Sequence, residues 1–530
     1  MNLRRLLNLG KFIPQRRVVA FGLGVIAFTN CGAADSDAQR SPPLYILKPD
    51  AFAHHIEHFN TMEDEPVVNL VPNAESWAWL KTNVPFFTCD DAEVEEIYWF
   101  RWWSLRKHLR IEPVNKRHVF TEFLTKARPV SSALGHHLME GRWLRNQSPY
   151  DDYVMYWLRG AQGGKPQGHL HKYSQWLQHA LWQRWLVTQD TASLTGLLDD
   201  LVADYRRWES EKCTESGLFW QYDVWDAMEE SISGGRKTKN LRPPLNAYMY
   251  GNARALAAIA RLAEKVETAK EFDRKADELR RAIIEKLWNN DAKFFEVRRE
   301  DGTLADVREE LGFIPWYFEL PEPNKGFEIA WKQLTDGKGF RAPFGITTAE
   351  RRHPQFRSHG VGNCEWDGAV WPFATAQTLT ALANVLDDYP QNVVNKRDYF
   401  DAFITYTHSH RYDGKPYIGE YLDEVNGRWL KGKDPRSRYY NHSTYADLLI
   451  TGVIGLRPRA DDMLDLHPLL PEGTWAWFCI DGLRYHGRDL TIVWDLDGQH
   501  FGHGSGLAIF VNGKEIARRA QLGPINVRLP

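Results

Sequence analysis

The sequence predicts a mainly α-helical fold, an (α/α)6 toroid of helical hairpins followed by a small antiparallel β-module. From about Cys89 to Leu470, apolar residues recur at three- and four-residue spacing, as in amphipathic helices. The helices come in pairs joined by short polar turns, and longer loops separate the pairs. An α-solenoid would also stack helix pairs, but it ranks second because no repeat period is visible.

The periodicity delimits the individual helices. They are expected at Glu93–His108, Tyr173–Thr188, Asp190–Trp208, Tyr248–Val266, Ala269–Trp288, Gly368–Leu386, Arg397–Ser409 and Ser443–Val453, with a Trp-rich helix near Ala74–Lys81. Residues 125–170 and 217–247 are rich in Gly, Pro and aromatics, so we predict two long loops there. Loops of that length inside a compact domain usually carry function.

The last sixty residues have a different pattern, with short apolar runs separated by turn residues. The runs are residues 475–480, 490–494 and 507–511, and the turns are Asp481-Gly482, Asp497-Gly498 and Asn512-Gly513. We therefore expect four segments. They are residues 1–33, 34–88 (an N-terminal extension), 89–471 (the helical domain) and 472–530 (the β-module).

Residues 1–33 have the features of a secretory signal: basic residues, an apolar run over Val18–Phe28 and small residues after it. The run is too short for a membrane span, which needs about 20 apolar residues. Cys31 could instead carry the lipid of a lipoprotein signal, although Phe28-Thr29-Asn30 departs from the usual small residues. We expect export to the periplasm or cell surface, with contact to a membrane only through a lipid at Cys31.

The composition limits the classes of ligand that the protein is expected to bind. The formal net charge is −3, and no basic stripe indicates a nucleic-acid partner. The 22 Trp, 21 Tyr and 26 Phe are numerous, and several Trp stand beside charged residues. An indole face with polar neighbours suits a sugar ring, whereas the alternative is plain core packing. Dispersed cysteines without zinc spacing, and adjacent His136 and His137 pointing apart on a helix, predict no metal and no cofactor.

Three clusters combine acids with aromatic residues. The first is Gly217–Ser231, where four acids are interleaved with Trp220, Tyr222 and Trp225; the acids are Asp223, Asp226, Glu229 and Glu230. An acid buried against Trp has a raised pKa and keeps a proton to donate. The alternative interpretation of this cluster is a solvated acidic loop.

The second cluster is Cys364–Pro372, which leads into a helix with Pro372 in its first turn. The third is Ile418–Trp429, where Glu420 stands between Gly419 and Tyr421 in a turn-rich stretch. Hydrolysis of a glycosidic bond needs one carboxylic acid to protonate the leaving oxygen and a second carboxylate to activate water or attack the sugar. The three clusters could supply such a pair.

The order of these clusters resembles glycoside hydrolase family 63, which includes mannosylglycerate hydrolases, and more closely their mannosylglycerate-hydrolase-like relatives such as family 142. The family's Trp-x-Gly-x-Val-Trp-Pro motif matches Trp366–Pro372, and its acid and base motifs match the stretches around Asp226 and Glu420. The resemblance covers roughly residues 90–470. Asp367 and Ala369, like Ala227–Glu229, depart from the family's usual residues, so its substrates do not carry over.

The resemblance implies an exo-acting, inverting hydrolase of oligo- or polysaccharide fragments, with Asp226 as general acid and Glu420 as general base. Asp223 and Glu424 are the reserve candidates. The residues expected around the sugar are Tyr222, Trp225, Glu229, Asn246, Trp366, Asp367, Trp371, Tyr421 and His442. Two alternatives stay open. One is a polysaccharide lyase using Tyr440 and His442, and the other is a non-catalytic glycan-binding surface protein.

Overall fold

A computed structural model describes residues 43–358, 360 and 362–530. The predicted signal, residues 1–33 with Cys31, lies outside the described residues. The described residues belong to one compact unit. In this part of the chain, no helix has the length and apolar character needed to cross a bilayer.

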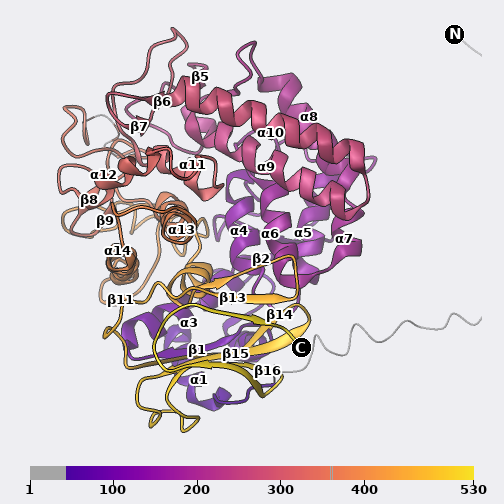
Figure 1. Ribbon diagram of the computed structural model, residues 1–530, viewed down its shortest axis with the longest axis vertical. Helices are drawn as coiled ribbons and strands as arrows, with labels where there is room; N and C mark the ends of the chain where they lie inside the picture. Colours follow the sequence, from indigo (N-terminus) through magenta and orange to yellow (C-terminus); the bar gives the residue numbers. More distant parts are fainter. Residues whose placement is uncertain (1–42, 359, 361) are drawn as a thin grey trace, which may run out of the picture. The chain divides into compact units, whose positions relative to one another are not determined.

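A closed ring of helices, each buried nearly all round, forms the centre of the described chain (Figure 1). The helices are α4 (Leu134–Gly141), α6 (Leu177–Thr188), α9 (Pro243–Leu262), α11 (Ile314–Tyr317), α13 (Pro372–Asp388) and α15 (Ala446–Leu448), the last continued by the π-helical turn η7 (Leu449–Val453). Each packs against the next in this order, and α15 returns to contact α4. The predicted (α/α)6 toroid is therefore confirmed.

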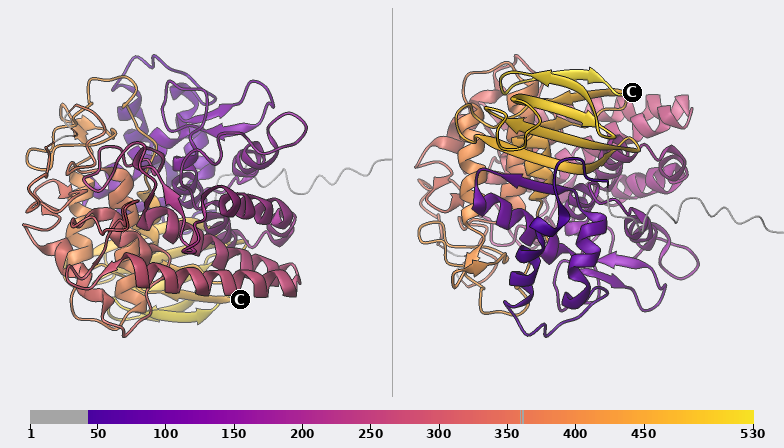
Figure 2. Two further views of the ribbon diagram at one scale, coloured as in Figure 1. Left: turned by 90° about the horizontal axis from the view of Figure 1, so that it is seen from above. Right: turned by 90° about the horizontal axis from the view of Figure 1, so that it is seen from below.

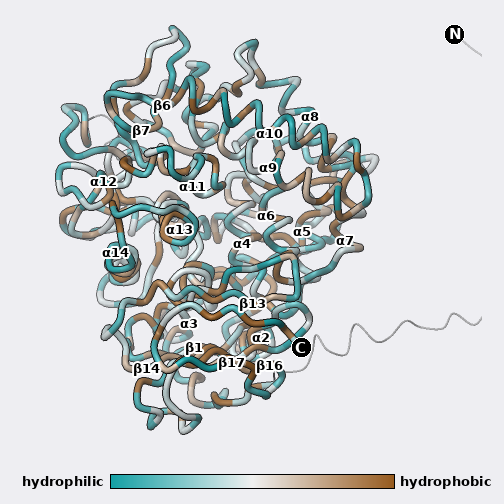
Figure 3. The backbone as a smooth tube through the Cα atoms, in the orientation of Figure 1, coloured by the Kyte–Doolittle hydropathy of each residue, from teal (hydrophilic) through white to brown (hydrophobic). Residues whose placement is uncertain are grey.

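Amphipathic helices cover this inner ring. They are α3 (Ala92–Arg106), α5 (Ser148–Arg159), α7 (Thr191–Thr195), α8 (Leu198–Lys212), α10 (Val266–Leu287), α12 (Lys332–Thr335) and α14 (Lys396–His408). Helix α10 buries Phe272, Leu279 and Ile283 against α9 and exposes its charged face, as its mixed colouring shows (Figure 3). The amphipathic pattern of α10 is the kind of helical period that the sequence shows.

The structure corrects two predictions about helices. Residues 125–170 are not one long loop, because α4 and α5 lie within them. The α4 sequence is short and contains Gly, His and Glu, yet it is buried as an inner helix whose polar groups find partners. The predicted helix Asp190–Trp208 is interrupted near Gly196, which separates α7 from α8.

The C-terminal strands form an antiparallel sheet that also recruits the N-terminal extension (Figure 2). Its order is β1 (Phe86–Cys89), β14 (Trp477–Tyr485), β15 (Arg488–Asp495), β16 (Gly506–Val511) and β17 (Lys514–Arg519). A second sheet joins β12 (Leu456–Arg457), β13 (Met463–Leu466) and β18 (Ile525–Arg528). Helices α1 (Ala53–Asn60) and α2 (Ser76–Asn83), the latter the predicted Trp-rich helix, pack beside α3.

The predicted turn at Asp481-Gly482 is wrong, because both residues lie inside β14 at a bulge. The side chain of Asp481 accepts hydrogen bonds from the backbone N–H groups of residues 45–47, which ties the N-terminal segment to the sheet. The chain turns instead at His486-Gly487, where both residues have positive φ. Asn512-Gly513 forms the turn between β16 and β17, as predicted.

Because an outer helix returns the chain after most inner helices, α4, α6, α9 and α13 run in one direction, and the loops that precede them meet at one mouth of the ring. Helix α15 begins deeper in the ring, beside the C-terminal end of α4. Consistent with this, the C-terminal halves of α6, α9 and α13 line one cavity together at the other mouth. The axis between the mouths is filled. Trp176 packs on Tyr248 (ring centroids 4.7 Å apart) and Tyr317 (6.0 Å), and Phe373 packs on His136 (4.6 Å).

Glu140 of α4 closes the ring. Its buried carboxyl group accepts hydrogen bonds from the N–H groups of Tyr445 (3.1 Å), Ala446 (2.9 Å) and Asp447 (3.0 Å), the first groups of α15. An acid is well placed there because a helix N-terminus carries partial positive charge and unpaired N–H donors.

Replacing Glu140 by Ala should lower the free energy of unfolding by about 3–5 kcal/mol, because buried N–H donors lose their acceptor. Glu140→Gln should also destabilise, since an amide has one acceptor oxygen where the carboxylate has two. The midpoint of thermal unfolding measures this. Glu57→Ala on the exposed face of α1 is the control, and an equal, small shift in both variants would contradict the role of Glu140.

Candidate active site

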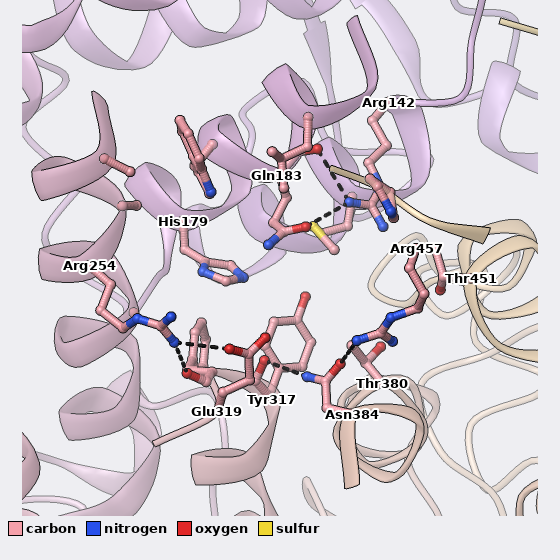
Figure 4. Close-up of a pocket in the computed structure, with 18 of the residues that line it drawn as sticks. Arg142, His179, Gln183, Arg254, Tyr317, Glu319, Thr380, Asn384, Thr451 and Arg457 are labelled. Atoms are coloured by element: carbon pink, nitrogen blue, oxygen red, sulfur yellow. Dashed lines mark hydrogen bonds and ion pairs between the residues drawn. The ribbon is translucent and has the colours of Figure 1, made fainter. Parts of the chain in front are cut away.

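The two mouths of the ring differ in which charged side chains they hold and in how these are paired. The far mouth holds a cavity of about 490 Å³ where arginines face the C-terminal ends of inner helices (Figure 4). Each of the arginines labelled there already has an acidic partner. The pairs are Arg142–Asp447 (2.7 Å), Arg254–Glu319 (3.1 Å) and Arg457–Asp388 (3.1 Å). Cations suit the negative end of a helix, so these groups have a structural explanation.

The N-terminal mouth instead gathers carboxyl groups. Glu122 precedes α4, Glu229 precedes α9 and Glu420 precedes α15. Burial raises the pKa of Glu122 to about 8 and that of Glu229 to about 7, and the negative charge of Glu420 contributes to both rises. Glu229 also raises the pKa of Glu122. The three carboxyls therefore share one electrostatic environment, in which at least one of them holds a proton at neutral pH.

The carboxyl group of Glu420 lies between two cations. Lys431 lies 3.4 Å from one carboxyl oxygen and Arg436 lies 3.3 Å from the other. The Glu420 N–H donates to the Ser437 hydroxyl (2.9 Å). The next residues of this segment pair with the 366–371 segment through mutual hydrogen bonds of Leu422 and Val370.

The backbone conformation of the loop that carries Glu229 is constrained on both sides of this residue. Ala227 and Glu230 have φ of 60° and 64°, a left-handed conformation that is costly for residues other than glycine. Strain of this kind persists only where the surroundings enforce it, and here it brackets Met228 and Glu229. The Asp223 side chain fixes the loop by accepting hydrogen bonds from Val224 (2.7 Å) and Gly235 (3.1 Å).

Asp226, predicted as the general acid, forms a buried ion pair with Arg242. Its Oδ2 accepts from Nε of Arg242 at 2.8 Å, and both side chains are 0% exposed. Burial raises the pKa of Asp226, while the Arg242 charge opposes that rise. The Asp226 side chain is therefore enclosed and held by an arginine. Its burial resembles that of a structural residue, whereas Glu229 is half-buried.

The other predicted site residues also differ in their burial and in their hydrogen-bond or ion-pair partners. Asn246 is fully buried and uses both ends of its amide on the backbone of Phe219 and Arg242, and its sugar contact stays a prediction. Glu424, the reserve base, forms an ion pair with Arg357 at 2.7 Å. Asp367 is buried and accepts a hydrogen bond from Gly360 N–H (2.9 Å).

The predicted aromatic wall is a stack of Trp366, Trp371 and Tyr421, with ring centroids 4.5 and 4.6 Å apart. All three rings are buried, so in this conformation they support the Glu420 segment from behind. Tyr222 and Trp225 are half-buried, pack edge to face, and have more surface to offer a ligand. The carbonyl of Trp225 accepts from the N–H of Ser174, which places this pair beside the segment that precedes α6.

His442 and Tyr440 lie beside Glu122. The Tyr440 hydroxyl donates to Glu122 Oε1 (2.8 Å), and His442 Nδ1 lies 2.5 Å from the same hydroxyl. Burial holds the pKa of His442 well below its usual value and raises the pKa of Tyr440. The raised pKa of Tyr440 disfavours the phenolate form that a lyase base requires.

Sequence reasoning missed several residues of this mouth. They are Glu122, Tyr173, Cys364, Lys431 and Arg436, whose charges or dipoles act on Glu229 or Glu420. Tyr173 and Cys364 have pKa values raised to about 12, mainly by burial and then by Glu229. Each of these residues lies in a loop that precedes an inner helix. That position in the sequence could have marked them as candidates for the site.

The closed helical ring with paired carboxyls at one mouth defines the class of protein, an (α/α)6 glycoside hydrolase. Residues 126–443 match the mannosylglycerate hydrolase MGH1-like glycoside hydrolase domain, which is more than half of the chain, and the chain belongs to this family. Residues 456–518 match the C-terminal domain of glycosyl hydrolase family 65.

Solved structures agree with this assignment. A protein called a sialidase is 48% identical with a TM-score of 0.89, over 91% of this chain and 45% of that chain, so this chain spans less than half of that protein. A GH63 mannosylglycerate hydrolase from Thermus thermophilus in complex with glucose is 14% identical (TM-score 0.50; 66% and 98% covered). A GH78 family rhamnosidase of Bacillus sp. GL1 is 14% identical (0.55; 78% and 40%). The last two show the fold alone.

If Asp226 is structural, Asp226→Ala should lower the free energy of unfolding by about 3–5 kcal/mol, because it leaves Arg242 buried without its partner. The double variant Asp226→Ala with Arg242→Met should recover part of that loss. Denaturant unfolding of the single and double variants measures both. Unchanged stability in Asp226→Ala, with activity lost, would return Asp226 to the catalytic role that the sequence indicated.

Proposed function

We propose that the protein is an exo-acting, inverting glycoside hydrolase in which Glu229 is the general acid and Glu420 the general base. One observation carries the choice of residues. At the N-terminal mouth, the charge of Glu420 acts on a half-buried Glu229 whose pKa is about 7. A protonated acid and an ionised carboxylate in one electrostatic environment are the two groups that glycoside hydrolysis needs.

Glu229 would donate its proton to the leaving glycosidic oxygen. A pKa near 7 is suited to this step, because the group is substantially protonated at neutral pH and still acidic enough to give the proton up. Asp226 lies three residues earlier and would act as a positioning residue, with Arg242 and Asp223 fixing the loop.

Glu420 would remove a proton from the attacking water. Its cations, Lys431 and Arg436, stand 3.3–3.4 Å from the carboxyl oxygens. Inversion needs a separation of about 6.5–9.5 Å between the two carboxyls, which leaves room for that water.

The filled axis of the ring supports exo action. Trp176, Tyr248 and Phe373 close the floor between the two mouths, so a chain entering the N-terminal mouth would not pass through. A blind pocket favours cleavage from a chain end. The signal predicted at residues 1–33 supports an exported enzyme that meets its glycan in the periplasm or at the cell surface.

Glu229→Gln and Glu420→Gln should each reduce kcat by about 10²–10⁴-fold, which is the usual contribution of a general acid or base. A panel of aryl glycosides and pectic oligosaccharides supplies the assay, and thermal unfolding confirms that both variants fold. Glu230→Gln, beside the acid and paired with Arg236 at the surface, is the matched control. Near-full activity in either variant would refute its assigned role.

The pH dependence should separate the two roles. Because Glu229 must be protonated, the rate of the unaltered enzyme should fall as pH rises through about 7. Glu229→Gln should lose that alkaline limb, and its rate should recover most on substrates whose leaving group needs no proton, such as dinitrophenyl glycosides. A surviving alkaline limb in this variant would assign the acid to another residue.

The first-formed sugar should have the anomeric configuration opposite to that of the substrate. Proton NMR during the first minutes of hydrolysis, before mutarotation, records it, and monosaccharide should accumulate from the start if the action is exo. Product with the configuration retained would contradict the proposed mechanism and would fit carboxyls about 5–5.5 Å apart.

A further inference from the structure

A second cavity, of about 330 Å³, opens beside the proposed catalytic residues. Its lining includes Lys126, Arg128, Lys172 and Arg436, and it contains no acidic residue. Among the described residues, Lys126, Arg128 and Lys172 form no ion pair, and all three are exposed. Three unpaired cations around one hollow create a local positive potential.

The lowered pKa of the nearby His169 is consistent with this positive potential. His169 lines the same cavity, and its pKa is lowered first by burial and then by the positive charges of Arg128 and Lys172. The far cavity of Figure 4 is also rich in arginine, but there each of the labelled arginines is matched by an acid. The cations of this second cavity therefore lack the structural explanation that accounts for those of the far mouth.

The cavity is continuous with the catalytic site through two shared side chains. Arg436 forms the ion pair with Glu420 and also places its guanidinium 4.3 Å from the ring centroid of Phe123, which lines the cavity. Tyr173 lines the cavity too, and its pKa responds to Glu229, Glu122 and Arg436. A ligand in this cavity would thus lie next to the two proposed catalytic carboxyls.

We infer that this cavity is a subsite for an acidic sugar, a uronic-acid residue whose carboxylate is bound by Lys126, Arg128 and Lys172 next to the bond that is cleaved. The inference rests on the proposed function and names the substrate class: a glycan that carries carboxylates. Tyr173 supplies an aromatic surface for the C–H side of the ring, while arginine and lysine supply the charge-assisted hydrogen bonds.

The test compares two triple variants made on the Glu229→Gln background, so that the probes are not consumed. One is Lys126→Ala, Arg128→Ala and Lys172→Ala, and the control is Lys265→Ala, Lys325→Ala and Lys332→Ala, three exposed lysines with no ion pair in the described structure. Calorimetry measures the binding of trigalacturonic acid and of neutral galactotriose. Thermal unfolding verifies that each variant folds.

We expect trigalacturonic acid to bind the control variant at least 10-fold more tightly than galactotriose does, and more weakly as salt increases. The Lys126/Arg128/Lys172 variant should lose that preference, while its binding of galactotriose stays unchanged. Equal binding of the two probes to the control, or an undiminished preference in the cavity variant, would overturn the inference. Preference for a sulfated galactose oligosaccharide over trigalacturonic acid would overturn the choice of carboxylate.

The failure of this inference is distinguishable from failure of the proposed function. With Glu229 restored, the cavity variant should lose activity on acidic oligosaccharides more than on neutral ones, whereas the lysine control variant should keep the ratio of the two activities. If Glu229→Gln retains full activity while trigalacturonic acid still requires the three cations, the catalytic assignment fails and the acidic subsite stands.

Discussion

The closure of the inner ring is the constraint on which the site depends. Glu140 joins α4 to the first N–H groups of α15, and this contact brings the last inner helix against the first. With the ring closed, loops from distant parts of the sequence end at one mouth. The N-terminal helix ends there carry partial positive charge, which helps that mouth to hold several carboxyl groups.

The acids near this mouth differ in what surrounds them, and the choice of Glu229 over Asp226 as the proposed acid rests on that difference. Asp226 has a dedicated arginine partner and no exposed side-chain surface. Glu229 has neither and shares the environment of Glu420, so its proton is governed by burial and by a neighbouring negative charge. The same distinction applies to cations. Among the described residues, arginines at the far mouth are paired, whereas Lys126 and Arg128 are not.

Much of the fold could be predicted from the sequence, because amphipathic helices and the apolar strands have periods that survive without tertiary context. Helix α4 could not, since it is only eight residues long and its Gly, His and Glu residues are buried with the apolar ones. The sequence identifies the stretch around Glu229 as a cluster of acids. Its hydrophobic pattern does not show which of these acids is buried with a partner and which is not. The left-handed conformations of Ala227 and Glu230, which shape this loop, are not visible in the sequence pattern. Glu122 and Arg436 come together only through ring closure.

The most direct measurement is a crystal structure of the Glu229→Gln enzyme with an uncleaved oligosaccharide. The proposed mechanism predicts a glycosidic oxygen within hydrogen-bond distance of the side chain at position 229, with Glu420 on the opposite face of the sugar and a water between them. A sugar seated instead in the far cavity among Arg142, Arg254 and Arg457, or held with its glycosidic oxygen against Asp226, would contradict it.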